Sequence, residues 1–178
     1  MFRRLAGDLQ DHGCKLHCLD LFPSNGDASL DELAEQIAAY IEANFAPSQN
    51  IDLVGFSMGG LVARYYVQRL GGIQRVGRLI TIASPHKGTW TALFRGNPAA
   101  RQMRPWSAFL RELNDDVAAL KRIRFVSIWT PMDLMIVPAK SCALEPGWAM
   151  CVNVLAHPLM LKDKRVLGLV RSVIMEKD

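Results

Sequence analysis

The hydrophobic positions of the chain follow two spacings in turn. Apolar side chains recur at helical spacing, in one case after a capping-box pattern of Ser29 and Glu32, over residues 2–12, 30–45, 61–70 and 162–177. Short and mostly apolar runs of strand type lie at residues 14–21, 51–54, 78–83, 124–129 and 150–155. Because strands and helices alternate, we predict an α/β fold, with a mostly parallel sheet of about five strands and helices on both faces.

The pattern becomes weaker between residues 84 and 120. Proline and glycine interrupt this stretch, and large apolar residues such as Trp90, Phe94 and Trp106 are scattered through it. Two interpretations stay open: a lid or cap that borders the substrate, or short helices that merely cover the sheet. No repeat, linker or low-complexity tract divides the sequence, so we expect residues 1–178 to form a single domain.

A strand, a tight turn and a helix follow one another within ten residues around Ser57. Gly55-Phe56-Ser57-Met58-Gly59 fits the Gly-x-Ser-x-Gly pattern of a nucleophile elbow, in which the serine hydroxyl projects above the strand ends. We expect Gly55 and Gly59 to leave out side chains that would clash at the turn. The following helix directs its N-terminal N–H groups at the same place, so the Met58 amide is the candidate oxyanion donor. The alternative is a glycine-rich loop that happens to contain a serine.

Two further polar residues follow predicted strands. Asp133 comes after the run at 124–129, and His157 comes after the run at 150–155. Because the carboxyl ends of parallel strands lie at one edge of a sheet, we expect Ser57, Asp133 and His157 to meet there. A serine hydroxyl needs an imidazole to take its proton and a carboxylate to orient that imidazole. The chain order of nucleophile, acid and histidine is the order of an α/β-hydrolase triad.

Each partner of the serine has competitors. His86 is the rival base, and Asp115 or Asp116 is the rival acid, although neither aspartate follows a predicted strand. Singly, an aspartate after a strand is often a helix cap, and a histidine before a proline is often a loop residue. The candidates for contact with the substrate are Phe56, His86 and Trp90.

Composition narrows the classes of partner. The net charge of +4 is mild, and the basic residues are scattered without the interleaved aromatic residues of a nucleic-acid platform, so we expect no nucleic-acid partner. No apolar run approaches the roughly 18 residues of a membrane span. Residues 1–8 begin with basic residues but lack an apolar stretch behind them, so we expect no secretory signal and a cytoplasmic location.

The cysteines argue against a metal site. Cys14, Cys18, Cys142 and Cys151 form no Cys-x-x-Cys pair and have no histidine at metal-ligand spacing. Reduced thiols are the default for a chain without a signal peptide. We therefore expect four free cysteines, no metal and no organic cofactor.

The sequence resembles the α/β-hydrolase lipases and esterases, particularly the bacterial triacylglycerol-lipase-like branch. The resemblance rests on residues 53–66, 83–89 and 102–114, on Asp133 followed by Ile136-Val137-Pro138, and on His157 before Leu159 and Leu161. It implies a serine hydrolase of carboxylic esters, with Ser57 as nucleophile, His157 as base, Asp133 as the orienting acid and the Met58 amide in the oxyanion hole. Phe56 stands where the family often has a histidine.

One family feature does not match. Family members normally begin with a central strand that ends in a His-Gly motif, and the loop after it supplies a second oxyanion donor. Here the chain opens at the helix that follows, so we expect either that the strands at 14–21 and 51–54 pair directly or that a longer native chain exists. Loss of one oxyanion donor typically costs about 100- to 1,000-fold in turnover.

The sequence favours hydrophobic acyl esters, including lipids, as substrates, because the insertion at 84–120 is rich in large apolar residues. A thioesterase or a deacylase of a lipid anchor is the alternative within enzymes. A hydrolase-fold binding protein without turnover is the alternative outside them, and the unmatched first strand is its best argument.

Overall fold

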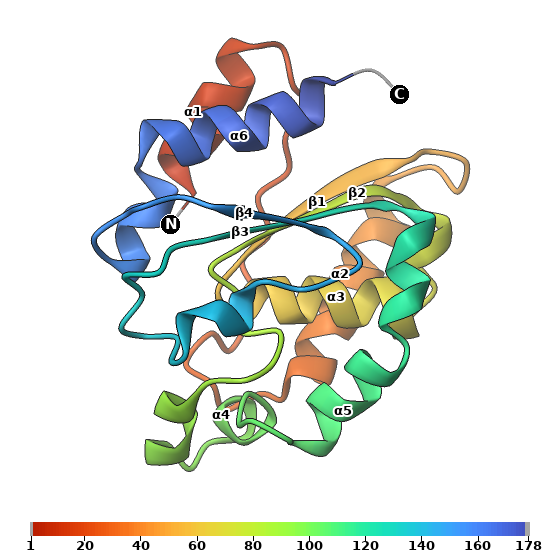
Figure 1. Cartoon of the computed structure of the whole chain (residues 1–178). Coiled ribbons are helices and arrows are strands. Elements are labelled where there is room, and N and C mark those ends of the chain that lie inside the picture. The colour runs from red at the N-terminus through yellow and green to blue at the C-terminus, as the bar shows by residue number, and fades with distance from the viewer. Residues whose placement is uncertain (1, 177–178) are drawn as a thin grey trace.

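A four-stranded parallel sheet lies at the centre of the molecule (Figure 1). The structure is a computed structural model and describes residues 2–176. The strands run in the order β1-β2-β3-β4, with bounds β1 Ile51–Phe56, β2 Val76–Ile82, β3 Arg124–Trp129 and β4 Trp148–Cys151. All neighbouring pairs are parallel, so the four carboxyl ends share one edge of the sheet, at the left in Figure 1. We call it the carboxyl edge.

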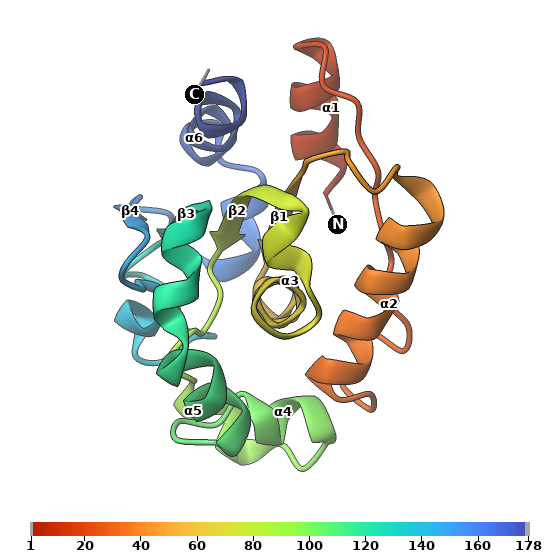
Figure 2. The same cartoon turned by 90° about the vertical axis from the view of Figure 1, so that its right-hand side faces the viewer.

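Helices cover both faces of the sheet, as predicted (Figure 2). One face carries α1 (Arg3–Asp11) and α6 (Lys164–Met175). The other face carries α2 (Leu30–Asn44) and α3 (Met58–Arg69), and α4 (Pro98–Gln102) and α5 (Ala108–Asp115) lie beyond α3. Five 3₁₀ helices complete the described elements: η1 Gly72–Gln74, η2 Trp90–Phe94, η3 Val117–Arg122, η4 Ala139–Cys142 and η5 His157–Leu161.

The two faces of the sheet form two hydrophobic cores. Side chains of a strand point alternately to opposite faces. In β2, Leu79 packs with α2 and α3, whereas Ile80 and Ile82 pack with α1 and α6. In β3, Phe125 and Val126 divide between the faces in the same way. This burial on both sides explains why the predicted strands are apolar throughout instead of alternating with polar residues.

The predicted capping box begins α2. The N–H of Glu32 donates to Ser29 Oγ, and the N–H of Ser29 donates to Glu32 Oε2 at 2.8 Å. These two bonds satisfy N–H groups that have no acceptor inside the helix.

The prediction of a strand at residues 14–21 is wrong, and the sheet has four strands instead of about five. This segment has no strand partner; His17 Nδ1 instead shares a 2.9 Å hydrogen bond with the Tyr40 hydroxyl on α2. Among residues 2–176, β2 is the only strand paired with β1, so direct pairing between 14–21 and β1 is wrong as well. An apolar run becomes a strand only where a neighbour completes its backbone hydrogen bonds.

The last strand and the final helix also differ in their bounds from the prediction. The last strand was predicted at 150–155 but ends at Cys151, and the buried Val152 and Val154 belong to the loop that leads to His157. The final helix begins at Lys164 behind its cap Asp163, and Lys177 of the predicted helix lies outside the described residues.

The stretch 84–120 forms short helical pieces, of which α4 and α5 pack against α2 and α3. Within residues 2–176, no helix is long and apolar enough to cross a bilayer.

The four cysteines are unpaired, as predicted. Burial raises the pKa of the Cys142 thiol.

Candidate active site

Ser57 occupies a strained turn between β1 and α3. Its backbone has φ 52° and ψ −125°, a conformation that non-glycine residues rarely adopt. Its N–H donates to the Ile82 carbonyl at 2.8 Å, which fixes the turn to the end of β2. A Cβ atom on Gly55 would lie 2.5 Å from the Gly60 Cα, so β1 and α3 approach closely only because residue 55 is glycine. This strand–turn–helix geometry is that of a nucleophile elbow.

The second glycine of the elbow differs from the prediction. A Cβ atom on Gly59 would meet nothing within 4 Å, so no clash is avoided there. A Cβ atom on Gly60 would overlap the Ser84 side chain and come 3.1 Å from the Thr81 Cβ. The glycine that allows α3 to pack on β2 is therefore the residue after the motif.

His157 and Asp133 form a buried hydrogen-bonded pair. His157 Nδ1 and Asp133 Oδ2 lie 2.6 Å apart, and each residue is 4% exposed. The other carboxylate oxygen, Oδ1, accepts the N–H groups of Met135 and Ile136, both at 2.9 Å. The loop after β3 thus holds one carboxylate oxygen of Asp133, and the His157 imidazole holds the other. A neutral His157 that donates from Nδ1 keeps Nε2 free to take a proton.

The imidazole lies beside the elbow. The rings of Phe56 and His157 are 4.7 Å apart between centroids, and Phe56 directly precedes Ser57. Met58 is the first residue of α3, so its N–H group has no acceptor within the helix. Phe56 at the end of β1, Asp133 after β3 and His157 after β4 therefore lie together at the carboxyl edge of the sheet.

Thr130 joins the two loops that carry Asp133 and His157, and sequence reasoning missed it. Its buried hydroxyl donates to the Val154 carbonyl at 2.7 Å and accepts the Val154 N–H at 3.1 Å. A threonine three residues before a candidate acid carries no sequence signal for this role, because its partner lies 24 residues away in the chain.

His86, the rival base, is fully buried in the core. Its Nε2 lies 2.9 Å from Thr81 Oγ1, and its ring packs against Phe125. Burial, together with the positive charges of Arg64 and Lys87, holds its pKa well below the usual value for histidine. A ring with this environment is inaccessible to a substrate, so the structure gives His86 a structural place instead of the predicted substrate contact.

The rival acids are also placed away from His157. Asp116 Oδ2 forms a 2.6 Å ion pair with Arg69 Nη1 on α3. Asp115 is exposed at the end of α5. Asp133 is the carboxylate that reaches the imidazole.

Arg64 is a buried cation behind the elbow. Its guanidinium donates to the Leu113 carbonyl and to Gln68 Oε1, at 2.6 Å and 2.7 Å. Burial is the main cause that lowers its pKa to about 9, with Arg69 adding to the effect. The bond to Leu113 ties α3 to α5 and so supports the helix that begins at the elbow.

Trp90, the third predicted substrate contact, lies at the surface. It is 42% exposed, and its ring meets that of Trp106 edge-on at 5.2 Å. Within residues 2–176, no three His, Cys, Asp or Glu side chains come together as metal ligands would.

A match to the sequence profile of a known family shows to which family the chain belongs. The profile described as palmitoyl protein thioesterase matches residues 2–119, well over half of the chain. The chain belongs to the palmitoyl protein thioesterase family. Ser57 of this family member lies inside the matched stretch, whereas Asp133 and His157 lie beyond it.

Two relatives each cover about half of this thioesterase-family chain. It is 33% identical over 92 residues to a triacylglycerol lipase of Pseudarthrobacter phenanthrenivorans, which is 51% of this chain and 28% of the lipase. It is 31% identical over 93 residues to a GPI inositol-deacylase of Candida albicans, which is 52% of this chain and 19% of that protein. The matched stretch thus spans less than a third of either relative.

The fold of this thioesterase-family chain is also known. The mature form of Bacillus licheniformis lipase BlEst2 resembles it with a TM-score of 0.77, covering 96% of this chain and 83% of the lipase at 14% identity. The predicted α/β-hydrolase fold is confirmed in its parallel sheet and its two helical layers.

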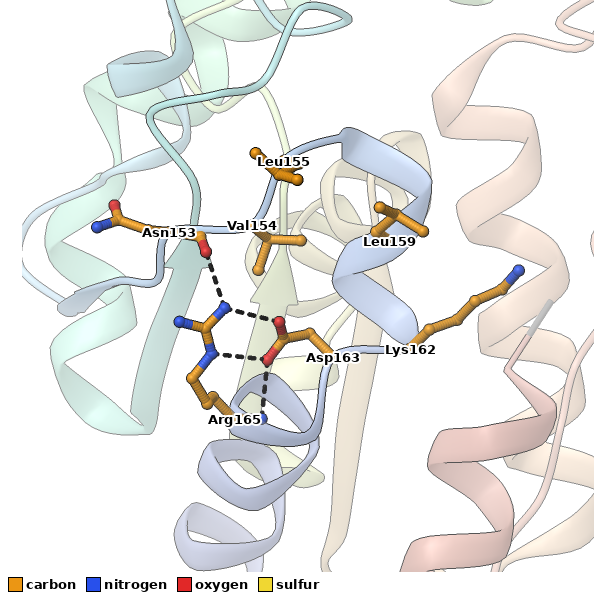
Figure 3. Close-up of a pocket in the computed structure, with 7 residues that line it drawn as sticks. All are labelled: Asn153, Val154, Leu155, Leu159, Lys162, Asp163 and Arg165. Carbon is orange, nitrogen blue, oxygen red and sulfur yellow. Dashed lines mark hydrogen bonds and ion pairs between the residues drawn. The ribbon is translucent and has the colours of Figure 1, made fainter.

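A pocket of about 290 Å³ opens beside the loop that leads to His157 (Figure 3). Figure 3 shows Leu155 and Leu159 on one side of it and the pair of Asp163 and Arg165 on the other. Hydrogen bonds from Arg165 lower the pKa of Asp163 to about 2. The Arg165 guanidinium donates to both Asp163 and the Asn153 carbonyl, so its charge is already paired within the protein.

Proposed function

We propose that this chain is a serine hydrolase that cleaves esters of hydrophobic acyl groups. The observation that carries the proposal is the buried hydrogen bond between His157 and Asp133 beside the strained turn at Ser57. The predicted base and acid come from separate strand ends, and a histidine–carboxylate pair next to a nucleophile elbow is the arrangement that activates a serine.

In the proposed reaction, Ser57 Oγ attacks the acyl carbon while His157 Nε2 takes the hydroxyl proton. Asp133 accepts the Nδ1–H of His157 and stabilises the imidazolium that forms. The Met58 N–H donates to the oxyanion of the tetrahedral intermediate. His157 then returns the proton to the leaving alcohol, and water hydrolyses the acyl-serine through a second tetrahedral intermediate, with His157 again acting as base and then as acid.

Hydrophobic acyl groups are proposed from the surroundings of the site. The Phe56 ring packs against the His157 imidazole. Leu155, which is exposed, lies on the loop that leads to His157. The lipase among the relatives is named for triacylglycerol, which is consistent with this choice.

A series of p-nitrophenyl esters from acetate to palmitate tests the proposal. We expect kcat/KM to rise from the acetate to the longer acyl chains, and Ser57→Ala to abolish hydrolysis of every member. An optimum at acetate would contradict the hydrophobic acyl pocket, and turnover by Ser57→Ala would contradict the nucleophile.

A thioester is the second candidate substrate. The family profile is described as palmitoyl protein thioesterase, and the chemistry at Ser57 differs only in the leaving group. Palmitoyl-CoA and p-nitrophenyl palmitate have the same acyl group, so a comparison of their kcat/KM values separates the candidates. A ratio strongly in favour of the thioester would identify a thioesterase.

A further inference from the structure

Several large apolar side chains are exposed on the loops after β3 and β4 at the carboxyl edge and on residues 90–106. They include Phe94 at 89%, Leu134 at 85%, Leu155 at 77% and Trp106 at 71%. Large apolar residues exposed together mark interaction surfaces in soluble proteins. We call the set the apolar rim; it comprises Trp90, Leu93, Phe94, Trp106, Leu134, Met135, Val137, Leu155 and Leu159.

Direct contacts join the segments that carry the rim. The N–H of Trp90 in η2 donates to the Val137 carbonyl at 2.8 Å. Thr91 Oγ1 donates to the Met135 carbonyl at 2.7 Å. With the edge-on packing of Trp90 on Trp106, η2, the turn after α4 and the loop after β3 form one continuous piece of surface.

Two segments of the rim adjoin the candidate active site. Leu134 directly follows Asp133, and Leu155 lies two residues before His157. Because Asp133 and His157 are hydrogen-bonded, the two loops that expose these leucines meet at the catalytic pair. Figure 3 shows Leu155 and Leu159 side by side at the pocket that they help to line.

The stretch that carries Trp90, Leu93, Phe94 and Trp106 is basic. Residues 84–111 contain five Lys and Arg residues and no Asp or Glu: Lys87, Arg95, Arg101, Arg104 and Arg111. Arg95 and Arg101 are exposed, and Arg104 donates to the Arg95 carbonyl at 2.9 Å. Lys140 and Lys162 are exposed on the other segments that carry the rim. The acidic residues of the rest of the insertion include Glu112 and Asp116, which both pair with Arg69 on α3.

We propose that the apolar rim is a docking surface for an anionic phospholipid bilayer. The exposed tryptophan and phenylalanine side chains of the rim suit insertion at the level of the headgroups, and the lysines and arginines of the same segments suit anionic headgroups. The inference does not rest on the proposed catalytic activity, because no catalytic side chain is needed for docking.

The test is sedimentation of the whole chain with vesicles. We expect binding to vesicles of phosphatidylcholine with about 30% phosphatidylglycerol, weak binding to pure phosphatidylcholine, and loss of binding at high salt. Phe94→Ser and Leu134→Ser should each lower the partition coefficient by about tenfold. Arg95→Gln and Arg101→Gln should each lower it by about fivefold.

Matched controls lie at the opposite edge of the sheet. Arg78 and Arg124, near the starts of β2 and β3, both bind Glu176, so the exposed Met175 beside it faces away from the rim. Met175→Ser and Arg122→Gln should leave the partition coefficient unchanged. Circular dichroism melting of each variant shows that the fold is retained.

Ser57→Ala should bind vesicles as well as the unaltered chain, so a failure of the catalytic proposal is separable from a failure of this one. Absence of binding to anionic vesicles would overturn the docking surface. Binding that the rim variants leave unchanged, or that Met175→Ser lowers equally, would overturn it as well. Binding restricted to a protein component of natural membranes, and absent from pure lipid vesicles, would overturn it too and show that the rim fits a protein partner instead.

Discussion

At the scale of single residues, we expect Asp133 to fix the tautomer of His157. In Asp133→Asn, the amide would offer an N–H to His157 Nδ1 and so place the imidazole proton on Nε2, where it blocks transfer from the serine. We expect this variant to lower kcat on a soluble ester by about 10⁴-fold. The remaining amide oxygen still accepts the N–H groups of Met135 and Ile136, so the melting temperature should change little. A loss of less than tenfold would contradict the role of Asp133.

His86 makes the stability of the fold sensitive to acid. Its folded pKa is depressed below the unfolded value of about 6.5, because burial, Arg64 and Lys87 all oppose a charged ring. Below that pH the unfolded chain binds more protons, so the stability present above about pH 6.5 is lost as the pH falls. This residue contributes a slope of at most about 1.4 kcal/mol per pH unit.

Urea unfolding of the unaltered chain and of His86→Gln, at a series of pH values from about 7.5 down to about 4.5, measures this slope. We expect the variant to lose less stability as the pH falls, since its other titrating groups are the same. Equal slopes would show that His86 does not titrate on unfolding.

At the scale of elements, the junction of β1 and α3 depends on which glycine is replaced. Gly60→Ala forces a Cβ atom into Ser84, and overpacking of this kind typically costs about 1–3 kcal/mol. Gly59→Ala meets open space and replaces glycine in a helix, so it should be neutral or stabilising. Chemical denaturation compares the two variants, and an equal cost for both would contradict the packing described for the elbow.

Substitution of Thr130 tests how the loops after β3 and β4 are held together. Thr130→Val leaves the buried N–H and C=O of Val154 without their partner, which should cost about 1–3 kcal/mol of stability. It should also lower kcat, because Asp133 and His157 depend on these loops for alignment. Thr130→Ser keeps the hydroxyl and should recover most of both losses; recovery of stability without recovery of kcat would contradict the alignment role.

Local signals predicted most elements. The capping box at Ser29 and the turn at Ser57 depend on neighbours in sequence, and both formed as predicted. The segment 14–21 failed because its apolar pattern suits a strand, whereas pairing depends on a neighbour that no local pattern reports. Gly60 and Thr130 were missed for the same reason, since their contacts lie far away in the chain.

At the scale of the whole molecule, the candidate catalytic residues and exposed apolar side chains lie at the same edge of the sheet. The parallel sheet brings Ser57, Asp133 and His157 from three strand ends to that edge, although 100 residues separate the first from the last. The loops that hold the acid and the base also expose Leu134 and Leu155. The roles of the three catalytic candidates follow from chain order and strand ends, and they stay predictions until the serine is shown to react.

The most direct test of the account is labelling of the whole chain with a fluorophosphonate probe, because the probe reports an activated serine whatever the natural substrate. The account predicts stoichiometric labelling at Ser57 that is lost in Ser57→Ala and in His157→Ala. Labelling that persists in Ser57→Ala, or no labelling of a correctly folded chain, would contradict the claim that Ser57 is an activated nucleophile.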